Sequence, residues 1–492
     1  MITLMQLDVM TAQGPVRGRE RKGVGLFAGI PYAAPPVGER RWKPPAPVDT
    51  WTEVRDCTRF GPAAPQLPGD GLTNATPIDW DEDCLTLNVC TPAADGRGRP
   101  VMVWIHGGAY RNGTGATPWY DGTNFARNGD IVVVTINYRL GALGFCRLPG
   151  EPTAGINGTL DQLAALRWVR ENIAAFGGDP DRVTIAGESA GGFSVTTLLA
   201  MESASGLFGR AIPQSGAGHH VLDDAVADVV TELFLDELGV ASADDARSLD
   251  PLAVLEAQAR VEGRAGAHIG RATQPFYPSV HPEHLPALPV ELLARGAGSD
   301  VAVLTGTNAD ETTLFGMGQV PEDKLAHLMR HYVDPPEALI AEYRAAHPDA
   351  DASEIAVMLT TDYSFRIPAV RMAEARAAHG AETWMYLFDW KSQAFGGALG
   401  ATHALEIPFT FATLDRPGVD LFLGTDELPW HVSTAMHESW INFMTTGSPV
   451  TDALAGWRPY HPDDRAVMRF ADEHTLVVDP GASVREAWSD HR

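Results

Sequence analysis

Short apolar runs rich in β-branched residues recur along this chain, and each is bounded by Gly, Pro or Asp. Runs that are continuous rather than alternating are typical of strands buried on both faces of a parallel sheet. Stretches with helical periodicity separate them, as in residues 160–176. This alternation of strand and helix predicts a doubly wound α/β fold with a mostly parallel sheet. The apolar runs cover residues 101–105, 131–136, 183–186, 301–306 and 384–388.

The chain has 492 residues, without an internal repeat or a linker-like segment. We therefore expect one large domain over residues 1–492. The segment 223–264 is acidic, Ala-rich and helical in pattern, and we expect it to form a helical cap. Two Pro- and Gly-rich segments, 31–47 and 61–77, predict long ordered loops, which in compact enzymes often cover a site.

Charge narrows the range of partners. The 63 acidic and 37 basic residues give a formal net charge of -26. Such a surface repels phosphate backbones and anionic lipids, so neither nucleic acid nor a membrane is an expected partner. The N-terminus lacks a basic start followed by an apolar stretch, and the longest apolar runs are too short to span a bilayer. We expect a cytoplasmic protein.

The chain contains four cysteines. They form no Cys-x-x-Cys pair, which disfavours zinc-ribbon and thioredoxin-like sites. So few thiols in a long chain are more typical of buried core residues than of a disulfide framework. These residues are Cys57, Cys84, Cys90 and Cys146.

The strongest chemical motif is Gly187-Glu188-Ser189-Ala190-Gly191, which matches G-x-S-x-G. Alone it is weak, because a chain with 49 glycines matches by chance in roughly one case in six. Its context is specific: a predicted strand ends at the first Gly, and residues 190–201 read as a helix. Strand, sharp turn and helix together predict a nucleophile elbow with Ser189 at its corner. The alternative is an ordinary strand–helix connection in which Ser189 caps the helix.

A second Gly-rich turn, His106-Gly107-Gly108-Ala109, follows directly on the run 101–105. Acyl transfer needs backbone N–H donors aimed at the developing oxyanion, and small residues leave such amides accessible. The amides of Gly108 and Ala109 are therefore candidate donors, together with that of Ala190 after the nucleophile. The alternative is a plain glycine turn after a strand.

The order Ser, acid, His in a hydrolase of this kind places the acid after a later strand. Asp310 and Glu311 both follow the run 301–306, and spacing does not choose between them. Ten histidines lie beyond Glu311, and His403 stands out because it follows a Gly-rich loop after the run 384–388. The pair His219-His220 lacks a third ligand at workable spacing, so we interpret it as surface or loop histidines rather than a metal site.

These residues resemble the type-B carboxylesterases, the family of carboxylesterases and cholinesterases, from about Gly14 to Tyr460. The most specific likeness covers residues 176–191, which match the family's active-site signature without a mismatch, and Glu82-Asp83-Cys84-Leu85 resembles a second signature. Within this family, the chain resembles the bacterial para-nitrobenzyl esterases. Further matches are Asn137-Tyr138-Arg139-Leu140-Gly141, Pro213-Gln214-Ser215-Gly216 and Trp440-Ile441-Asn442-Phe443.

The resemblance implies a catalytic triad of Ser189, Glu311 and His403. The family's acid is the Glu of an Asp-Glu-Gly motif, and here Thr312 replaces that Gly. The resemblance also implies oxyanion donors at Gly108, Ala109 and Ala190, in a loop of the GGG(A)X type that often admits esters of tertiary alcohols.

Three structural details also follow from the resemblance. It implies an ion pair between Arg41 and Glu82. Cys84 lacks its usual disulfide partner, because Ala64 stands at that place, and this fits a reducing compartment. The tryptophan that cholinesterases place against choline's ammonium group falls near Asn74, so we do not expect a cholinesterase.

The sequence thus predicts a serine carboxylic ester hydrolase that acts on small-molecule esters through an acyl-enzyme, without metal or organic cofactor. An amidase, carbamate hydrolase or lactonase with the same triad is the open alternative. A non-catalytic binding protein of the same fold is disfavoured, because such a protein is expected to lack the Ser, the acid or the His.

Overall fold

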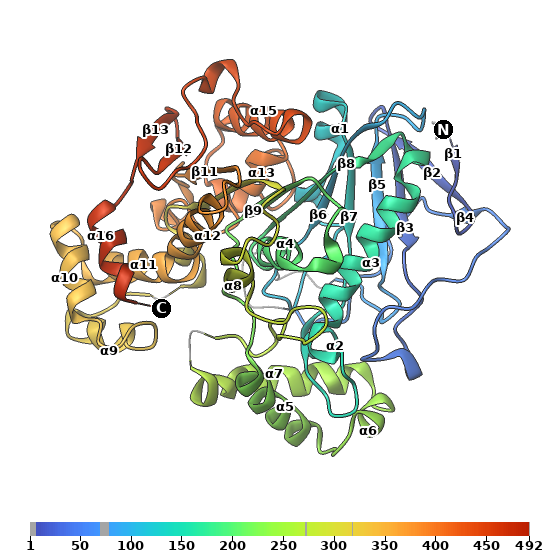
Figure 1. The fold of residues 1–492 in the computed structure, drawn as a ribbon, viewed down its shortest axis with the longest axis horizontal. Coiled ribbons are helices and arrows are strands. Elements are labelled where there is room, and N and C mark those ends of the chain that lie inside the picture. The colour runs from blue at the N-terminus through green and yellow to red at the C-terminus, as the bar shows by residue number, and fades with distance from the viewer. Residues whose placement is uncertain (1–5, 69–77, 271–272, 317, 492) are drawn as a thin grey trace.

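A computed structural model describes residues 6–68, 78–270, 273–316 and 318–491 (Figure 1). At its centre is a 13-stranded sheet. Seven neighbouring strands in this sheet run parallel, which confirms the predicted mostly parallel α/β fold. In sheet order they are β7 (Val132–Ile136), β6 (Arg99–Ile105), β8 (Gly178–Glu188), β9 (Arg210–Gln214), β10 (Ala302–Asn308), β11 (Thr383–Phe388) and β12 (Ala466–Phe470).

Antiparallel strands complete the sheet at both ends. At one end, β5 pairs with β7 and leads outward through β3 and β2 to β1, and the short β4 pairs with β2 in parallel. At the other end, β13 pairs with β12. Their bounds are β1 (Gln6–Met10), β2 (Pro15–Arg21), β3 (Val24–Pro31), β4 (Arg55–Asp56), β5 (Thr86–Thr91) and β13 (Thr475–Val478).

The continuous apolar runs are explained by two cores, one on each face of the sheet. Along β6, Val101, Val103 and Ile105 pack into one core, whereas Met102 and Trp104 pack into the other. Successive side chains of a strand point to opposite faces, so a strand covered on both faces has no polar side. The first core includes helices α2 (Gly141–Phe145), α3 (Asn157–Asn172), α4 (Ala190–Ala200), α5 (Asp224–Leu238) and α7 (Pro251–Ile269), and the second includes α1 (Thr123–Gly129), α13 (Ile407–Thr410) and α15 (Trp430–Thr446).

Two further helical groups lie at the periphery (Figure 1). The helical pattern predicted over 223–264 corresponds to α5, the short α6 (Ala243–Arg247) and α7. A second group surrounds a third apolar core and contains α9 (Leu325–Met329), α10 (Glu337–Ala346), α11 (Ala352–Thr361) and α16 (Ala482–Ala487). A π-helical turn, η8 (Asp362–Arg366), joins α11 to α12 (Ile367–Ala377). The remaining α-helices are α8 (Pro289–Ala294) and α14 (Asp420–Leu423).

Several smaller predictions are met with adjusted boundaries. The helix expected over 160–176 is α3 followed by a 3₁₀ turn, Ile173–Phe176, and the helix expected over 190–201 ends one residue earlier. The Arg41 guanidinium binds both carboxylate oxygens of Glu82, at 2.7 and 2.6 Å. All four cysteines are free and buried. Residues 69–77, which include Asn74, lie outside the described residues.

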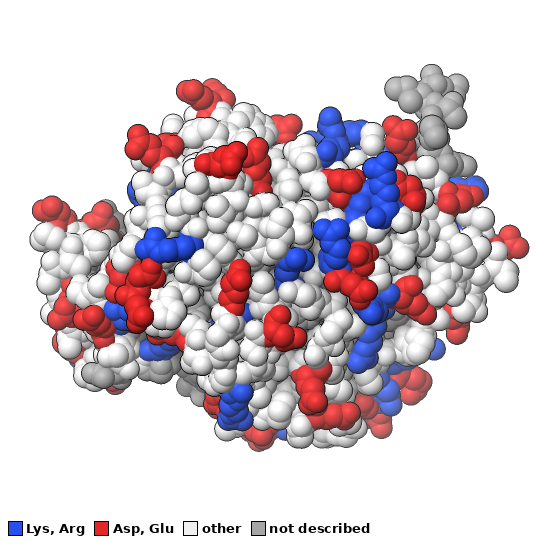
Figure 2. Space-filling view, turned by 45° about the horizontal axis from the view of Figure 1, so that its top comes forward, with Lys and Arg blue, Asp and Glu red and all other residues white. Residues whose placement is uncertain are grey.

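The described residues contain no helix that is both long and apolar enough to cross a membrane. Within these same residues, no group of three or more His, Cys, Asp or Glu side chains is placed to hold a metal ion. Figure 2 shows acidic side chains scattered over one face of the molecule, with basic side chains among them. On this face the two signs of charge are therefore interspersed, and no large patch of a single sign stands out.

Candidate active site

The candidate residues all follow the carboxyl ends of neighbouring parallel strands. Gly108 and Ala109 follow β6, Ser189 follows β8, and Glu311 follows β10. His403 lies at the end of the connection that leaves β11. The carboxyl edge of a parallel sheet is where open α/β proteins bind their ligands, so the fold gathers these residues at one edge.

Ser189 occupies a strained corner between β8 and α4. Its φ of 57° and ψ of -125° lie in a region that residues with a side chain rarely adopt, at a cost of about 1–3 kcal/mol. The corner is fixed on both sides: the Ser189 N–H donates to the Gln214 carbonyl at 3.0 Å, and the Phe193 N–H donates to the Ser189 carbonyl at 2.8 Å. The serine is thus the N-cap of α4 with a backbone unlike that of an ordinary cap.

Glycines make this corner possible. A Cβ at Gly191 would lie 2.0 Å from the Ile105 carbonyl oxygen at the end of β6. A Cβ at Gly107 would lie 2.6 Å from the Glu188 carbonyl oxygen and 3.1 Å from the Ser189 Cβ. Since no side chain fits at such separations, α4 and the loop after β6 approach each other and Ser189 as closely as backbone allows.

The loop after β6 has an unusual backbone too. Gly108, Ala109 and Tyr110 all have positive φ, at 111°, 54° and 59°. Two amides, those of Arg111 and Asn112, donate to the Gly108 carbonyl and close the turn. Among the hydrogen bonds of the described residues, none has the amide of Gly108, Ala109 or Ala190 as its donor.

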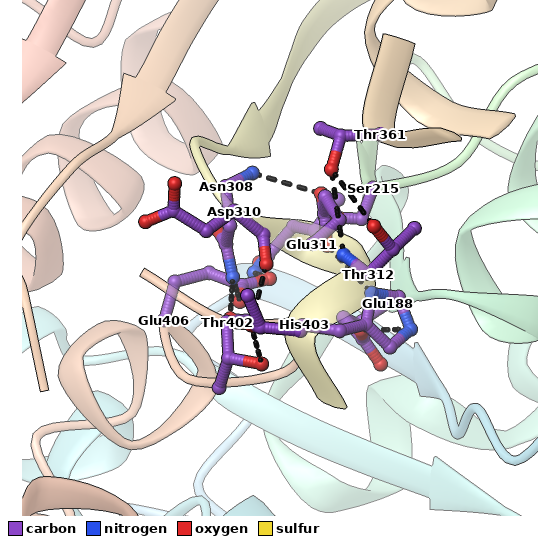
Figure 3. Close-up of polar contacts among 12 residues, drawn as sticks. Glu188, Ser215, Asn308, Asp310, Glu311, Thr312, Thr361, Thr402, His403 and Glu406 are labelled. Carbon is purple, nitrogen blue, oxygen red and sulfur yellow. Dashed lines mark hydrogen bonds and ion pairs between the residues drawn. The ribbon is translucent and has the colours of Figure 1, made fainter. Parts of the chain in front are cut away.

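Glu311 and His403 contact each other directly (Figure 3). The His403 Nδ1 lies 2.6 Å from the Glu311 Oε2, and both side chains are buried. The other carboxylate oxygen, Glu311 Oε1, accepts from the Ser215 hydroxyl at 2.6 Å and from the Asn308 amide at 2.8 Å. Three donors therefore hold one carboxylate, and the imidazole orientation is fixed by it.

Asp310, which sequence spacing could not distinguish from Glu311 as the acid, binds a lysine and a backbone amide instead of His403. Its Oδ2 accepts from the Lys391 ammonium at 2.5 Å and from the Ala401 amide at 2.7 Å. The Asp310 amide in turn donates to the Ala401 carbonyl. Asp310 therefore ties the loop that carries His403 to the turn that carries Glu311, without touching the imidazole.

Further hydrogen bonds join the same two segments, 308–313 and 399–403. The His403 amide donates to the Glu311 carbonyl, and the Asn308 side chain donates to the Thr402 carbonyl at 2.7 Å. The Thr313 hydroxyl lies 2.7 Å from the Leu399 carbonyl and 2.8 Å from the Thr402 hydroxyl. The Gly-rich loop before His403 is thus fastened along its last turn to the segment that carries Glu311.

Two further buried carboxyl groups face His403, and the sequence motifs did not identify either. The His403 Nε2 lies 3.1 Å from the Glu188 Oε1, on the side of the ring opposite Glu311. Glu406 lies deeper, where its oxygens accept from Asn308 at 2.6 Å and Gln214 at 3.1 Å. Among the described residues, the Ser189 hydroxyl makes no hydrogen bond, and Nε2 faces Glu188 instead.

Burial and charge shift the pKa values of this group. Burial alone disfavours the imidazolium, but the carboxylates of Glu188 and Glu311 outweigh it and raise the pKa of His403 to about 9. Burial raises the pKa of Glu188 to about 8 against the opposing effect of His403, and raises that of Glu406 to about 7. These buried groups interact with one another, so the ionisation of each depends on the state of the others.

Aromatic side chains line the surroundings of His403. The rings of Phe365 and Phe315 lie 4.9 and 5.3 Å from its imidazole. His220 is in a loop, as expected, but the interpretation as a plain loop histidine is incomplete, because its ring stacks on Phe193 at 3.6 Å. Phe193 lies one helical turn after Ser189, so His220 belongs to the wall of the site. No local pattern signals this, since the stack joins residues that only the fold brings together.

Comparison with known proteins identifies the family. Residues 5–487 match the carboxylesterase family. The chain belongs to this family. As a carboxylesterase it is an ester hydrolase, as predicted, with the α/β-hydrolase fold.

This carboxylesterase is 39% identical to the para-nitrobenzyl esterase of Bacillus subtilis, over 97% of both chains. It is 37% identical to the phenmedipham hydrolase of Pseudarthrobacter oxydans, over 95% of this chain and 96% of that one. A solved PNB esterase superposes with a TM-score of 0.88 at 38% identity, covering 98% of this chain and 99% of that one. A carboxylesterase of Geobacillus stearothermophilus gives 0.87 at 40% identity, over 98% and 100%.

Proposed function

We propose that this carboxylesterase hydrolyses small-molecule esters through an acyl-enzyme on Ser189, with His403 as general base and Glu311 as the acid that orients it. The contact that carries the proposal is the 2.6 Å bond between the His403 Nδ1 and the buried Glu311 carboxylate. A carboxylate on Nδ1 places the ring's proton there and leaves Nε2 as the basic nitrogen. A base so oriented, beside a serine on a strained elbow, is the arrangement that acyl transfer needs.

The first step joins Ser189 to the substrate. His403 Nε2 removes the proton from the Ser189 hydroxyl as its oxygen attacks the ester carbonyl carbon. The carbonyl π electrons move to the oxygen, and the amides of Gly108, Ala109 and Ala190 stabilise the resulting oxyanion. The collapse of this intermediate expels the alcohol, which takes the proton from His403.

The second step releases the acid. Water attacks the acyl-enzyme, gives its proton to His403, and passes through a second oxyanion at the same amides. Ser189 then leaves with the proton from His403. Glu311 stabilises the imidazolium that forms in each step.

The position of Nε2 beside Glu188 sets a condition on this mechanism. The imidazole must turn its Nε2 from the Glu188 carboxyl to the Ser189 hydroxyl when substrate binds, while Nδ1 keeps its bond to Glu311. Catalytic hydrogen bonds often tighten only in the substrate complex. Glu188 then lies beside the imidazolium, where its ionised form favours proton transfer to His403.

We propose that α5, α6 and α7 form a cap beside the site. The Glu262 carboxylate of α7 lies 3.3 Å from the Arg111 guanidinium, which follows the candidate oxyanion loop. Gln258 of the same helix accepts from the Ala142 amide at 2.9 Å. These contacts attach α7 to the segments around the loop after β6.

We also place this enzyme in the cytoplasm, a proposal supported by its four free, buried thiols.

The proposal is tested by covalent labelling and hydrolysis on the same protein. A fluorophosphonate is expected to modify Ser189 alone, as located by mass spectrometry of the digested enzyme. Ser189→Ala should abolish both labelling and the hydrolysis of para-nitrobenzyl acetate, whereas Ser205→Ala, at an exposed serine, should change neither. Label on another residue, or full activity in Ser189→Ala, would refute the assignment. The matched N-benzyl acetamide distinguishes an esterase from an amidase.

A further inference from the structure

Thr312 stands directly after Glu311, at the place where the resemblance implies a glycine (Figure 3). Thr312 is 6% exposed, and its hydroxyl lies 3.2 Å from the Val357 carbonyl of α11. Its hydroxyl lies 2.8 Å from that of Thr360 and 3.3 Å from that of Thr361, the last two residues of α11. Three buried hydroxyls therefore meet between the acid turn and the end of a helix that lies far from it in sequence.

One arrangement of the protons satisfies all three hydroxyls of this cluster. The Thr360 hydroxyl donates to the Ala356 carbonyl at 2.7 Å, which leaves its oxygen to accept from Thr312. The Thr361 hydroxyl then donates to the Thr312 oxygen, and it also accepts from the Thr312 amide at 3.4 Å. Each hydroxyl donates once within this arrangement, and a buried network that is satisfied in this way specifies one packing.

The helix end that Thr312 binds continues into the π-turn η8. A π-turn inserts an extra residue into a helix and redirects the side chains that follow. Here it turns Phe365 toward the site, with its ring 4.9 Å from His403 and 6.3 Å from Phe193. Asp362, the first residue of the turn, accepts from the Tyr343 hydroxyl at 2.5 Å.

We propose that Thr312 is a positioning residue that fixes the π-turn against the acid turn and thereby sets how large an ester the site accepts. It acts through Phe365, whose ring is the part of η8 that touches His403. Both anchors lie at the start of η8: Tyr343 binds Asp362, and the hydroxyl cluster binds the preceding Thr361. This inference rests on the proposed function, because the selectivity concerned is that of ester hydrolysis at Ser189.

Replacing the Thr312 hydroxyl by a methyl group tests the network at constant volume. A methyl carbon approaches a hydroxyl oxygen no closer than about 3.3 Å, so Thr312→Val pushes against the Thr360 oxygen, now at 2.8 Å. It also removes the acceptor for the Thr361 hydroxyl. The end of α11 must move away from the acid turn, and Phe365 moves with it. Glu311 keeps its bonds to Ser215, Asn308 and His403, so the base stays in place.

The experiment compares kcat/KM for a large and a small ester, in one series with the acyl group varied and in another with the alcohol varied. The acyl series compares 4-nitrophenyl benzoate with 4-nitrophenyl acetate. The alcohol series compares benzyl acetate with ethyl acetate. In Thr312→Val the kcat/KM for the large ester, divided by that for the small ester, should rise by at least roughly threefold in one of the two series. Thr312→Ser, which keeps the hydroxyl, should retain the wild-type ratio.

A matched control separates positioning from stability. Thr413 is another fully buried threonine, whose hydroxyl donates to the Trp119 carbonyl at 3.1 Å and takes no part in the cluster at α11. Thr413→Val should lower the melting temperature without moving either ratio. If Thr312→Val fails to fold, Thr312→Ala takes its place: it has no methyl clash but removes the same hydroxyl bonds to the end of α11, so the ratio should change in the same direction.

The outcomes are distinct from those of the proposed function. A wild-type enzyme that hydrolyses none of these esters refutes the proposed function. A wild type that is active, with ratios in Thr312→Val that stay unchanged or fall in both series, overturns the role of Thr312. The role of Thr312 is also overturned if Thr312→Ser or Thr413→Val changes the ratio as much as Thr312→Val does, because the effect would then not come from the Thr312 hydroxyl.

Discussion

The two halves of the site are built in different ways. On one side, Ser189 and the loop after β6 are positioned by backbone: positive φ angles, and glycines packed against carbonyl oxygens. On the other side, Glu311 and His403 are positioned by side-chain hydrogen bonds between two loops. The first half is therefore sensitive to added volume, and the second to the loss of a single donor or acceptor.

This difference follows from what each half has to do. Oxyanion donors are backbone amides, so their placement requires backbone to approach backbone, which glycine alone permits. A general base needs a fixed tautomer and a tuned pKa, and only charged and hydrogen-bonding side chains supply these. A substitution that adds volume should therefore disturb the backbone half most, and one that removes a donor or acceptor should disturb the side-chain half most.

Glu311→Gln is expected to have the largest effect, since it keeps the volume and changes only the acceptor. An amide on Nδ1 disturbs the tautomer and the charge that stabilise the imidazolium, so kcat should fall by about 10⁴-fold. Steady-state hydrolysis of para-nitrobenzyl acetate checks this. Asp310→Asn, which alters the bonds to Lys391 and Ala401 but not the imidazole, should be far milder. The reverse order would assign the acid to Asp310.

Gly107→Ala tests the backbone half. Its Cβ would lie 2.6 Å from the Glu188 carbonyl oxygen, so the loop after β6 must move away from Ser189. Misplaced amides stabilise the oxyanion poorly, and kcat should fall by about 10²-fold. Gly209→Ala, where an added Cβ meets no atom within 4 Å, is the control and should keep wild-type turnover. Wild-type kcat in a folded Gly107→Ala would show that the loop does not supply the donors.

Glu188→Gln should change the pH dependence. His403 acts as base only when neutral, and the carboxylates that raise its pKa to about 9 keep it protonated at lower pH. The activity of the wild type should therefore rise with pH through that value. Without the Glu188 charge the pKa of His403 falls, and the rising limb of kcat/KM should move down by roughly one pH unit. A limb that stays in place, measured with an uncharged ester, would mean that Glu188 does not act on the base.

The smallest effect concerns the alcohol side of the substrate. Gly108 and Ala109 are half-exposed at the site, and a loop of this type should leave room for three carbons next to the ester oxygen. We expect measurable hydrolysis of tert-butyl acetate, slower than that of n-butyl acetate, with Ser189→Ala as the blank. Phe315, whose side chain is 59% exposed near His403, is the side chain placed to oppose this. Brisk n-butyl hydrolysis with no tert-butyl signal would show that the aromatic wall, not the loop, controls access.

Much of the fold and the candidate site was predictable because the signals are local. Five buried strands were recognisable from continuous apolar runs, since a strand covered on both faces must be apolar throughout. The elbow at Ser189 was recognisable because strand, small residues and helix lie within a few positions of one another. The loop of Gly108 and Ala109 was recognisable for the same reason.

Other residues had no such local signal. Sequence spacing could not distinguish Asp310 from Glu311 as the acid. Neighbouring residues of a turn differ in where their side chains point, and the surrounding elements of the fold decide that. His220 looked like a loop histidine until Phe193, from another element, was placed beneath it. Glu188 occupied a position of its motif that any residue can fill, and nothing near it in sequence indicates that it faces an imidazole.

The sequence by itself determined the fold, the family and the elbow motif at Ser189, because each depends on backbone propensity and short-range pattern. Only the tertiary structure decided which carboxyl group binds His403, that Glu188 lies beside the same imidazole, and how Thr312 reaches the end of α11. Those properties depend on distances between segments that lie tens to hundreds of residues apart. Electrostatic and hydrogen-bond energies fall steeply with such distances, so they exist only once packing has brought the segments together.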